Sequence, residues 1–376
     1  MMVLSKEQSD FLALSMVDGL GPVAVRRLLK EFGSPEHIFS CTYKDFRFAT
    51  GLSHEIHSAL QNATGSKEFV EEKKYIAENG IGLLTVCDDG YPALLKEIYD
   101  PPTILECKGD LVETGMDCIA IVGSRICTSY GMQTAEKLAF DLASNGFTVV
   151  SGLARGIDQA AHRGALKAHG RTVAIMGSGF GHIYPANAGA LIEDIVHNGA
   201  VLTEFHSAVE PSVCTFPRRN RIIAGLCRGC VVVEAAKASG SLITANFALN
   251  EGREVFAVPG RIDSPNSFGT NALIQKGAKL VLTADDVLEE MDLMPKKTSV
   301  TVSGAIAEPG GRTETGEEIL SIFRGGTALH VDEIIEKTGL GIKVLSGALI
   351  ELECRKELRR VAGCSYVAVK EQGQRA

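Results

Sequence analysis

The sequence lacks any run of about 18 consecutive apolar residues, and its first residues contain no basic segment followed by an apolar one. These absences predict a soluble, cytoplasmic protein with neither a transmembrane helix nor a secretory signal. Positive charge is also scarce, because 38 lysines and arginines stand against 46 aspartates and glutamates, for a net charge of −8. This balance excludes a generally basic nucleic-acid binder, so any contact with nucleic acid has to be local.

The motifs of several enzyme classes are missing as well. The sequence contains no G-x-S-x-G, no H-E-x-x-H and no G-x-x-x-x-G-K-[ST]. A dinucleotide site needs G-x-G-x-x-G after its first strand, but here Gly123 is followed by Ser124 and Arg125. We therefore predict no catalytic residue, no metal site and no cofactor.

Two weaker chemical signals remain open. The ten cysteines are scattered, which favours free thiols in a reducing compartment, and Cys227 and Cys230 form a lone C-x-x-C without a second pair. A metal or redox function for that pair is the minor alternative. Asp158 and His162 lie four residues apart, and this spacing fits either a proton-transfer pair or an ordinary helical hydrogen bond or cap.

From about residue 81 the sequence alternates short apolar runs with helical patterns. Near-continuous apolar strands, each followed by a helix, are typical of a parallel sheet that is buried on both faces. We predict a doubly wound α/β domain over residues 81–291. Its expected strands are IGLLTVCD, CIAIVG, FTVVSG, TVAIMG, AVLTEF, CVVVEA, EVFAVPG and AKLVLT.

Smaller regions flank this domain. Residues 1–80 are helical by pattern, and residues 292–316 are rich in Pro, Gly, Ser and Thr, as a linker is. Residues 317–376 contain three short helical patterns and a final apolar run, which predicts a winged-helix-like domain. Because its third helix carries Glu351, Glu353 and Glu357, we favour a protein-contact or structural role for it over DNA binding.

The segment GLGPVAVRRLLKEFG, in the first region, has two interpretations. A Gly-apolar-Gly-Pro turn that opens a helix resembles a helix-hairpin-helix element, whose backbone N–H groups bind phosphate. A helix that begins at Pro22 and ends at Gly33 explains the same residues without a ligand.

Three glycine-containing turns follow strands of the predicted sheet. In a doubly wound sheet such turns meet at the carboxyl edge, where helix N-termini favour anions. A glycine after a strand is also ordinary turn geometry, so each turn alone is weak support. The residues that we expect to face phosphate there are Gly123, Ser124, Arg125, Gly152, Arg155, Gly156, Gly177 and Gly179.

The segment FPRRNRIIAG concentrates positive charge. No carboxylate occurs between Glu210 and Glu234, so these arginines have no acidic partner nearby in the sequence, and we predict that they bind an anion. The segment comes before the strand CVVVEA, which places it at the same edge, with Phe216 as a surface for stacking a base. The residues predicted to bind DNA here are Phe216, Pro217, Arg218, Arg219, Asn220 and Arg221, joined by Ser239 and Ser241 of the SGSLITA segment.

Eight motifs in order resemble the DNA-processing protein A family, DprA or Smf. They are VGSR, SGLARGID, AAHRGAL, the YP of GFGHIYPAN, FPRRNRIIAGL, VVVEA, SGSLITA and FAVPG, and the upstream segment DDGYPALLKEIYDPPTILECKGD is similar too. The resemblance covers about residues 10 to 290. It implies an extended Rossmann-like domain that binds and protects single-stranded DNA and loads the RecA recombinase on it in natural transformation. It implies no catalytic turnover.

The same resemblance implies further details. The family's G-S-R and F-P-x-R-N residues fall on Gly123 to Arg125 and on Phe216, Pro217, Arg219 and Asn220, and a homodimer is expected near NALIQKGAKLVLTADDVL. TEF stands at residues 203–205 where members usually have S-E. Two other functions stay open: a nucleoside phosphate hydrolase with Glu234 as its acid, and an interaction module whose glycine-rich edge binds nothing. The hydrolase lacks its P-G-G-x-G-T-x-x-E loop, since ASGSLITANFALNEG stands there.

Overall fold

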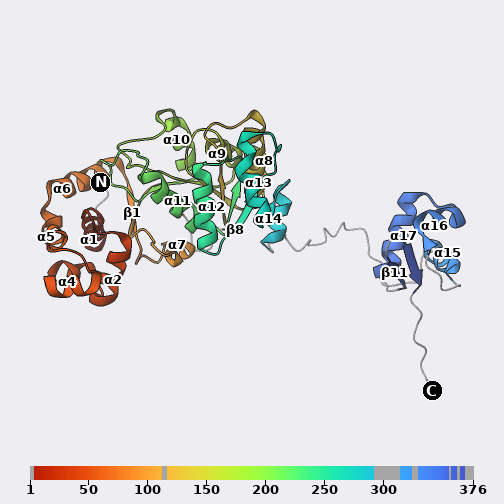
Figure 1. The fold of residues 1–376 in the computed structure, drawn as a ribbon, viewed down its shortest axis with the longest axis horizontal. Coiled ribbons are helices and arrows are strands. Elements are labelled where there is room, and N and C mark those ends of the chain that lie inside the picture. The colour runs from red at the N-terminus through yellow and green to blue at the C-terminus, as the bar shows by residue number, and fades with distance from the viewer. Residues whose placement is uncertain are drawn as a thin grey trace, which may run out of the picture. The chain divides into compact units, whose positions relative to one another are not determined.

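The computed structural model describes residues 4–111, 117–291, 314–323, 329–354, 357–361 and 365–368. The chain divides into two compact units, residues 1–296 and 297–376, which are described separately (Figure 1). The predicted linker lies outside the described residues up to position 313, and the next helix begins at Glu314. Within the described ranges, no helix is both long and apolar enough to cross a membrane.

The first unit begins with six short helices, as the sequence predicts. Side-chain caps begin several of them, because the hydroxyls of Ser5, Ser34, Thr42 and Ser66 each accept a backbone N–H of the first turn. Their apolar faces form one core around Phe11, which is fully buried. The helices are α1 (Lys6–Ser15), α2 (Pro22–Phe32), α3 (Pro35–Ser40), α4 (Tyr43–Thr50), α5 (His54–Asn62) and α6 (Lys67–Asn79).

A nine-stranded sheet forms the rest of this unit, in the order β1-β2-β6-β5-β4-β3-β7-β8-β9. From β6 to β9 all neighbouring strands are parallel, so the predicted doubly wound sheet is confirmed. The strands are β1 (Gly82–Thr85), β2 (Ile104–Gly109), β3 (Cys118–Val122), β4 (Thr148–Ser151), β5 (Thr172–Ile175), β6 (Gly199–Thr203), β7 (Gly229–Val232), β8 (Glu254–Ala257) and β9 (Lys279–Leu280).

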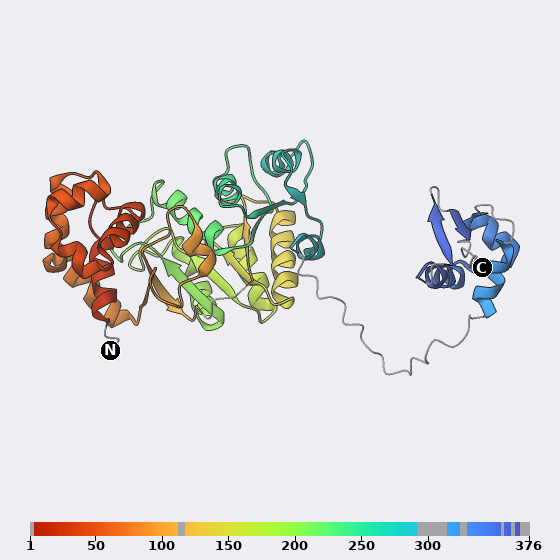
Figure 2. The same ribbon diagram turned by 90° about the horizontal axis from the view of Figure 1, so that it is seen from below.

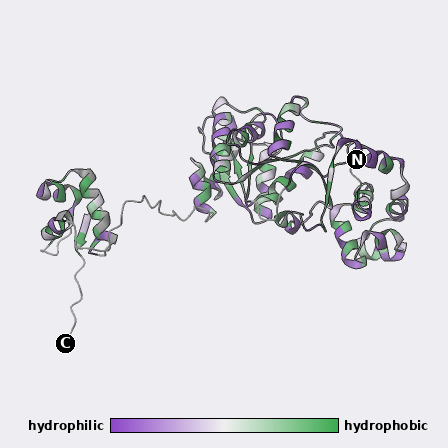
Figure 3. Ribbon diagram, turned by 180° about the vertical axis from the view of Figure 1, so that it is seen from behind, coloured by the Kyte–Doolittle hydropathy of each residue, from purple (hydrophilic) through white to green (hydrophobic). Residues whose placement is uncertain are grey.

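Helices cover both faces of the sheet, which is why its strands read as continuous apolar runs. Along β3, Ile119 and Ile121 pack toward one face, and Ala120 and Val122 toward the other. One face carries α8 (Ser129–Ser144), α9 (Ile157–Lys167), α10 (Gly189–Asn198) and α14 (Ala284–Glu290), and the other α7 (Ala93–Glu97), α11 (Thr215–Leu226), α12 (Gly240–Asn250) and α13 (Phe268–Gln275). Figure 2 shows these two helical layers from below, and Figure 3 shows how green apolar and purple polar residues mix along the helices.

The order of the strands places a topological switch point at β3. The chain moves from β3 outward through β4, β5 and β6, and then returns to the other side of β3 with β7, β8 and β9. The loops after β3 and β7 therefore leave the sheet on opposite faces and open a crevice between them.

Two findings differ from the sequence-based expectation. Strand β2 was not among the predicted strands, and it runs antiparallel to both β1 and β6. Its residues ILECKG include Glu106 and Lys108, which interrupt the apolar run by which the other strands are recognised. The second concerns FPRRNRIIAG, where the sequence has a helical pattern only from Asn220: α11 already begins at Thr215 and includes the whole segment.

The described residues of the second unit form three helices and a three-stranded antiparallel sheet in the order β10-β12-β11. Its core includes Ile319, Leu345, Leu349 and Tyr366. The elements are α15 (Glu314–Ile322), β10 (Leu329–His330), α16 (Val331–Thr338), α17 (Ile342–Cys354), β11 (Leu358–Val361) and β12 (Ser365–Ala368). This is the composition of a winged helix, three helices with a β-ribbon, as the sequence predicts.

Candidate nucleic-acid interface

A cavity of about 590 Å³ opens at the switch point, beside the carboxyl ends of β3 and β7. Its walls are the loop after β3, the first turns of α11 and the N-terminal end of α12, where the Ser239 hydroxyl accepts the Ser241 N–H. We call this space the switch-point cavity. Nine residues predicted to bind phosphate or DNA line it: Gly123, Ser124, Arg125, Phe216, Pro217, Arg219, Asn220, Ser239 and Ser241.

Arg125 is the exposed cation of this cavity. Its guanidinium lies over the Phe216 ring, 4.6 Å from the ring centroid, and Tyr184 packs beside the same ring with centroids 5.7 Å apart. No ion pair between described residues includes Arg125. A cation held by an aromatic face, with its N–H groups left for a ligand, suits a phosphate that arrives from solvent.

Arg219 lines the same cavity but is used differently. Its side chain is buried, with 4% of the residue exposed, and it donates to the carbonyl oxygens of Gly152 and Ile175 and, at 3.0 Å from Nε, to Asn220 Oδ1. Burial lowers the pKa of the guanidinium to about 10, with Asp158 opposing the shift, so Arg219 stays charged at neutral pH. The two carbonyl partners, Gly152 just after β4 and Ile175 in β5, lie far away in the sequence, so Arg219 is paired although no carboxylate lies near it in the sequence.

Four predicted phosphate-loop glycines, all outside the cavity lining, are closely packed by the protein itself. A Cβ on Gly152 would meet the Arg219 guanidinium at 1.9 Å, and one on Gly177 would meet the Phe216 ring at 2.8 Å. Gly179 packs in the same way on the backbone of His206. Gly156 has a φ of +83° and lies against the carbonyl oxygen of Ser124. Packing thus accounts for the glycine at each of these positions, and their contact with phosphate stays a prediction.

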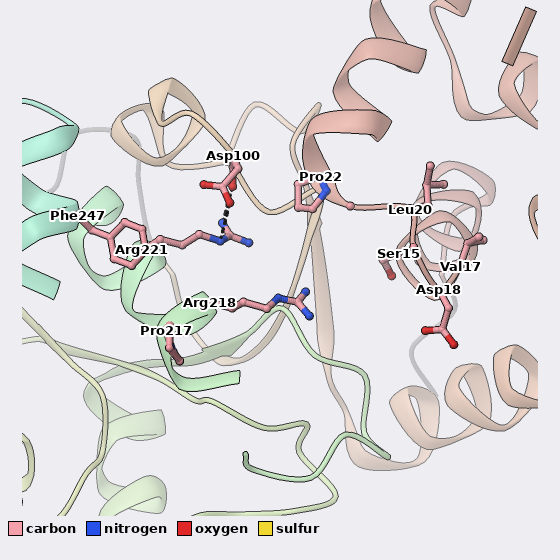
Figure 4. A pocket seen from close by; sticks show the side chains of 12 residues that line it. Ser15, Val17, Asp18, Leu20, Pro22, Asp100, Pro217, Arg218, Arg221 and Phe247 are labelled. Carbon is pink, nitrogen blue, oxygen red and sulfur yellow. Dashed lines mark hydrogen bonds and ion pairs between the residues drawn. The ribbon is translucent and has the colours of Figure 1, made fainter. Parts of the chain in front are cut away.

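The remaining arginines of α11 point into a second space, of about 520 Å³, between α11 and the turn from α1 to α2. We call it the interdomain cavity, because it lies between the helical region and the sheet region of the first unit. Figure 4 shows Arg218 extending into it and Arg221 bound to Asp100. Arg218 is exposed, and its Nε lies 3.6 Å from Glu204 Oε1, whereas Arg221 is buried and contacts Glu204 Oε2 and, at 3.2 Å from Nε, Asp100 Oδ2. Across the cavity lie Asp18, Leu20 and Pro22.

These contacts correct the charge argument made from the sequence. Arg221 pairs with Asp100 and Glu204, Arg218 shares Glu204, and Arg228 contacts Asp117 at 2.7 Å. These three arginines are neutralised by carboxylates from other parts of the chain, all of which lie outside the stretch between Glu210 and Glu234. Arg155 is exposed and lines neither of the two cavities described here.

Asp158 and His162 do not form a pair. Burial raises the pKa of Asp158 to about 6, although Arg219 and the backbone N–H groups of Gly123, Ala154 and Gly152 favour its charged form. His162 Nδ1 instead lies 2.7 Å from Thr172 Oγ1, and burial lowers the pKa of His162 to about 3. Since the Thr172 hydroxyl donates to Val149, His162 Nδ1 is the donor and the ring is neutral. A proton-transfer role for these two residues is unsupported by the geometry.

Comparison with known proteins identifies this arrangement. Residues 82–292 match the family model of DNA recombination-mediator protein A, and residues 308–363 match the DprA winged helix domain. Protein Smf of Synechocystis is 36% identical over 96% of this chain and 99% of its own length. The chain belongs to the DprA/Smf family.

Other members of the DprA/Smf family are similarly related. The DNA processing protein DprA of Streptococcus pneumoniae is 47% identical over 63% of this chain and 81% of its own. An X-ray structure from that organism superposes with a TM-score of 0.66 over 77% of this chain and 99% of that one, at 36% identity. A second structure, of DNA processing protein A from Helicobacter pylori, was described for its single-stranded DNA binding mode, and it has a TM-score of 0.51 at 31% identity over 56% of this chain and 95% of that one.

Glu234 has a structural task in this DprA/Smf chain. Its carboxylate accepts the Thr128 N–H at 2.9 Å and the Thr128 hydroxyl at 2.5 Å, which fixes the start of α8, and it lies over Gly131. It neither orients an arginine of the switch-point cavity nor lines that cavity. Cys227 and Cys230 are buried free thiols whose pKa values burial raises, and the described residues contain no cluster of three possible metal ligands.

Several residues at this interface were not predicted from sequence. Asn266, Thr244 and Ile126 line the switch-point cavity, and Glu204 and Asp100 hold the arginines of α11. For Glu204 a signal existed, since TEF closes the strand that leads toward α11. For Asn266 there was none, because it comes from the loop after β8 and reaches the cavity only through the fold.

Proposed function

We propose that this chain binds single-stranded DNA along the carboxyl edge of its sheet, with the switch-point cavity as the central contact. The observation that carries the proposal is the exposed Arg125 guanidinium, which lies on Phe216 at the mouth of a cavity lined by glycine, serine and asparagine. Arg125 supplies charge for a phosphate, and the Ile126 side chain, 85% exposed at the rim, supplies apolar surface for a base.

Single strands fit this cavity better than duplexes do, on physical grounds. An unpaired base can leave its stack and enter a cavity beside Phe216, whereas a duplex presents only its backbone and grooves to such a space. The rest of the protein is acidic, which repels phosphodiesters that do not reach the edge. Binding is therefore expected to be local and sensitive to salt.

We further propose that the protein protects incoming single-stranded DNA and loads the RecA recombinase on it, in the cytoplasm, during natural transformation and recombination. Membership of the DprA/Smf family and the family model's description as a recombination mediator support this role. It requires no catalytic turnover. The alternative, a nucleoside phosphate hydrolase with Glu234 as its acid, is disfavoured because both Glu234 oxygens already bind Thr128.

A homodimer is part of the same proposal. Strand β9 is the last strand of the sheet; Leu280 within it is 39% exposed, and Leu282 just after it is 71% exposed. Phe268, at the start of α13, is 55% exposed, whereas Leu273 and Val287 of the same region are buried in the core. An edge strand flanked by exposed apolar side chains is a surface that a second copy can cover, and two copies would join two DNA-binding edges.

The test is fluorescence anisotropy with a labelled oligo-dT and its duplex across a salt series. We expect a preference for the single strand and a steep salt slope. Arg125→Ala should lower the magnitude of that slope by about 0.7, the value for one phosphate on a single strand. The control is Arg47→Ala, which removes an exposed arginine of the helical region and should change neither quantity.

Two results would contradict the proposal. If the wild type binds no single strand at low salt, the mediator function is wrong, and release of free base from a nucleoside monophosphate, abolished by Glu234→Gln, becomes the assay to run. If Arg125→Ala and Arg47→Ala change binding equally, the switch-point cavity is not the contact site.

A further inference from the structure

Two glutamates are buried together between the helical region and the sheet. Glu72 of α6 and Glu106 of β2 are each 2% exposed, and their carboxyl groups are in hydrogen-bonding contact. Glu106 Oε2 has no hydrogen-bond partner among the described residues. Two carboxyl groups buried in contact cannot both be ionised without a cation between them.

No such cation faces the pair from the surrounding described elements. Lys108 follows Glu106 on the same face of β2, but its ammonium lies over the Phe180 ring, 5.3 Å from the centroid. On α6, burial raises the pKa of Tyr75, and the two glutamates raise it further. Burial and the charge of Glu72 hold the pKa of Glu106 well above its usual range. This raised pKa favours the protonated form of Glu106, in which its hydroxyl is the donor to Glu72.

The Glu72 carboxylate also accepts two hydrogen bonds from Ser207. The Ser207 N–H donates to Oε1 at 2.9 Å, and the Ser207 hydroxyl donates to Oε2. Ser207 lies in the loop between β6 and α11, and this loop packs on the chain at Gly179 and Gly181, where an added Cβ would strike the carbonyl oxygens of His206 and Ser207. The loop continues directly into Phe216 and Arg219.

We propose that Glu72 is a positioning residue for nucleic-acid binding, because its two hydrogen bonds to Ser207 fix the loop that sets the start of α11. This inference rests on the proposed function. The helical region thereby acts on the switch-point cavity without contributing a residue to its lining. The contact consists of one charged acceptor and three donors: the Ser207 N–H, the Ser207 hydroxyl and the Glu106 hydroxyl.

The direction of the pH effect follows from the protonation of Glu106. A carboxyl whose pKa is raised in the folded protein contributes stability at low pH, and this contribution is lost as the pH rises through the raised pKa. Above that point Glu106 and Glu72 repel each other, and the hold on Ser207 weakens. The loop between β6 and α11 should therefore loosen as the solution becomes more alkaline.

The experiment measures hydrogen exchange at the Ser207 amide, corrected for its intrinsic pH dependence, and oligo-dT affinity on the same full-length samples. Glu72→Gln should abolish the exchange protection of Ser207 and weaken oligo-dT binding by roughly 2- to 30-fold. The matched control is Glu71→Gln, the same change at the exposed neighbouring position, which should alter neither. If Glu72→Gln does not fold, Ser207→Ala takes its place. It removes the hydroxyl donor alone, so we expect an intermediate loss of exchange protection and of oligo-dT affinity.

Glu106→Gln tests the pH dependence of Ser207 protection and of oligo-dT affinity, which a merely structural role would leave unchanged. In the wild type, Ser207 protection should fall as the pH rises through the raised pKa of Glu106, and oligo-dT affinity should fall with it. In Glu106→Gln the Ser207 protection should stay flat and the matching fall in affinity should be absent, because the amide donates to Glu72 without ionising. An unchanged pH profile in Glu106→Gln, or Ser207 protection that survives Glu72→Gln, would overturn the inference.

The two proposals fail in different ways. If the wild type binds no oligo-dT, the proposed function and the positioning role are both wrong, while the exchange data still show whether Glu72 holds Ser207. If the wild type binds oligo-dT and Glu72→Gln releases Ser207 without a change in affinity, only the positioning role is wrong.

Discussion

The two cavities that Pro217 lines both contain arginines, but the switch-point cavity leaves its exposed arginine without an ion pair to any described residue, whereas the interdomain cavity pairs its arginines with carboxylates. In the switch-point cavity Arg125 lies on an aromatic ring and takes part in no ion pair between described residues. In the interdomain cavity Arg221 is buried between Asp100 and Glu204, and Arg218 shares Glu204. An arginine in a cavity thus indicates an anion site only when no carboxylate of the protein is paired with that arginine.

The strongest test of this contrast is Arg221→Ala. Removing the guanidinium leaves buried Glu204 without its closest cation, so we expect the free energy of unfolding to fall by about 3 to 5 kcal/mol. Urea denaturation measures this change in the free energy of unfolding. A double variant, Arg221→Met with Glu204→Leu, should recover much of the loss, since it removes both charges. A loss below about 1 kcal/mol, typical of a surface pair, would break the contrast between the cavities.

Asp158 gives a test that depends on pH. Its folded-state pKa of about 6 lies above the usual 3.8, so the native state holds the proton more tightly than the unfolded chain does. The free energy of unfolding should therefore fall by about 3 kcal/mol in all as the pH rises from below about 3 to above about 7. Asp158→Asn should remove this slope in urea denaturation, whereas Asp194→Asn, at an exposed position of α10, should keep it.

Arg219→Ala separates a structural arginine from a binding one. Because Arg219 donates to two main-chain carbonyls, we expect a loss of about 2 to 3 kcal/mol in unfolding free energy. Arg125→Ala, at an exposed position, should change this quantity by less than about 0.5 kcal/mol. Equal stability of the two variants would show that the buried geometry of Arg219 contributes nothing.

The smallest effect is expected for Arg218→Ala. Its side chain is 57% exposed, and its contact to Glu204 is 3.6 Å long, so the stability change should stay below about 1 kcal/mol. Its effect on oligo-dT affinity decides whether the interdomain cavity belongs to the DNA-binding surface. Thermal unfolding and anisotropy on one sample measure both, and a loss of affinity as large as that of Arg125→Ala would erase the distinction between the two cavities.

The fold was accessible from sequence wherever a strand is buried on both faces. The eight predicted apolar runs all contain strands, because parallel strands covered by helices need apolar residues at nearly every position. Strand β2 was missed because it contains Glu106 and Lys108, and Glu106 is buried in contact with Glu72. Such a contact arises between two distant segments and leaves no periodic signal.

The sequence brought many of the predicted binding residues to one place but did not show what each of them contacts. Nine of the sixteen line one cavity, although four of the five predicted glycines lie outside its lining. The sequence could not show that Gly152 makes room for Arg219, or that Asp100 and Glu204 neutralise Arg221. Each of these facts joins residues that are far apart along the chain.

The register of α11 has a consequence for how this protein tolerates change. Each residue added to a helix rotates the residues beyond it by about 100°. One insertion after Pro217 would therefore move Arg219 away from the carbonyl oxygens that it contacts and Arg221 away from Glu204. Point substitutions along this helix change one contact at a time, whereas an insertion or deletion exchanges the roles of all its arginines at once. The length of this segment is therefore under tighter constraint than the identity of any exposed residue in it.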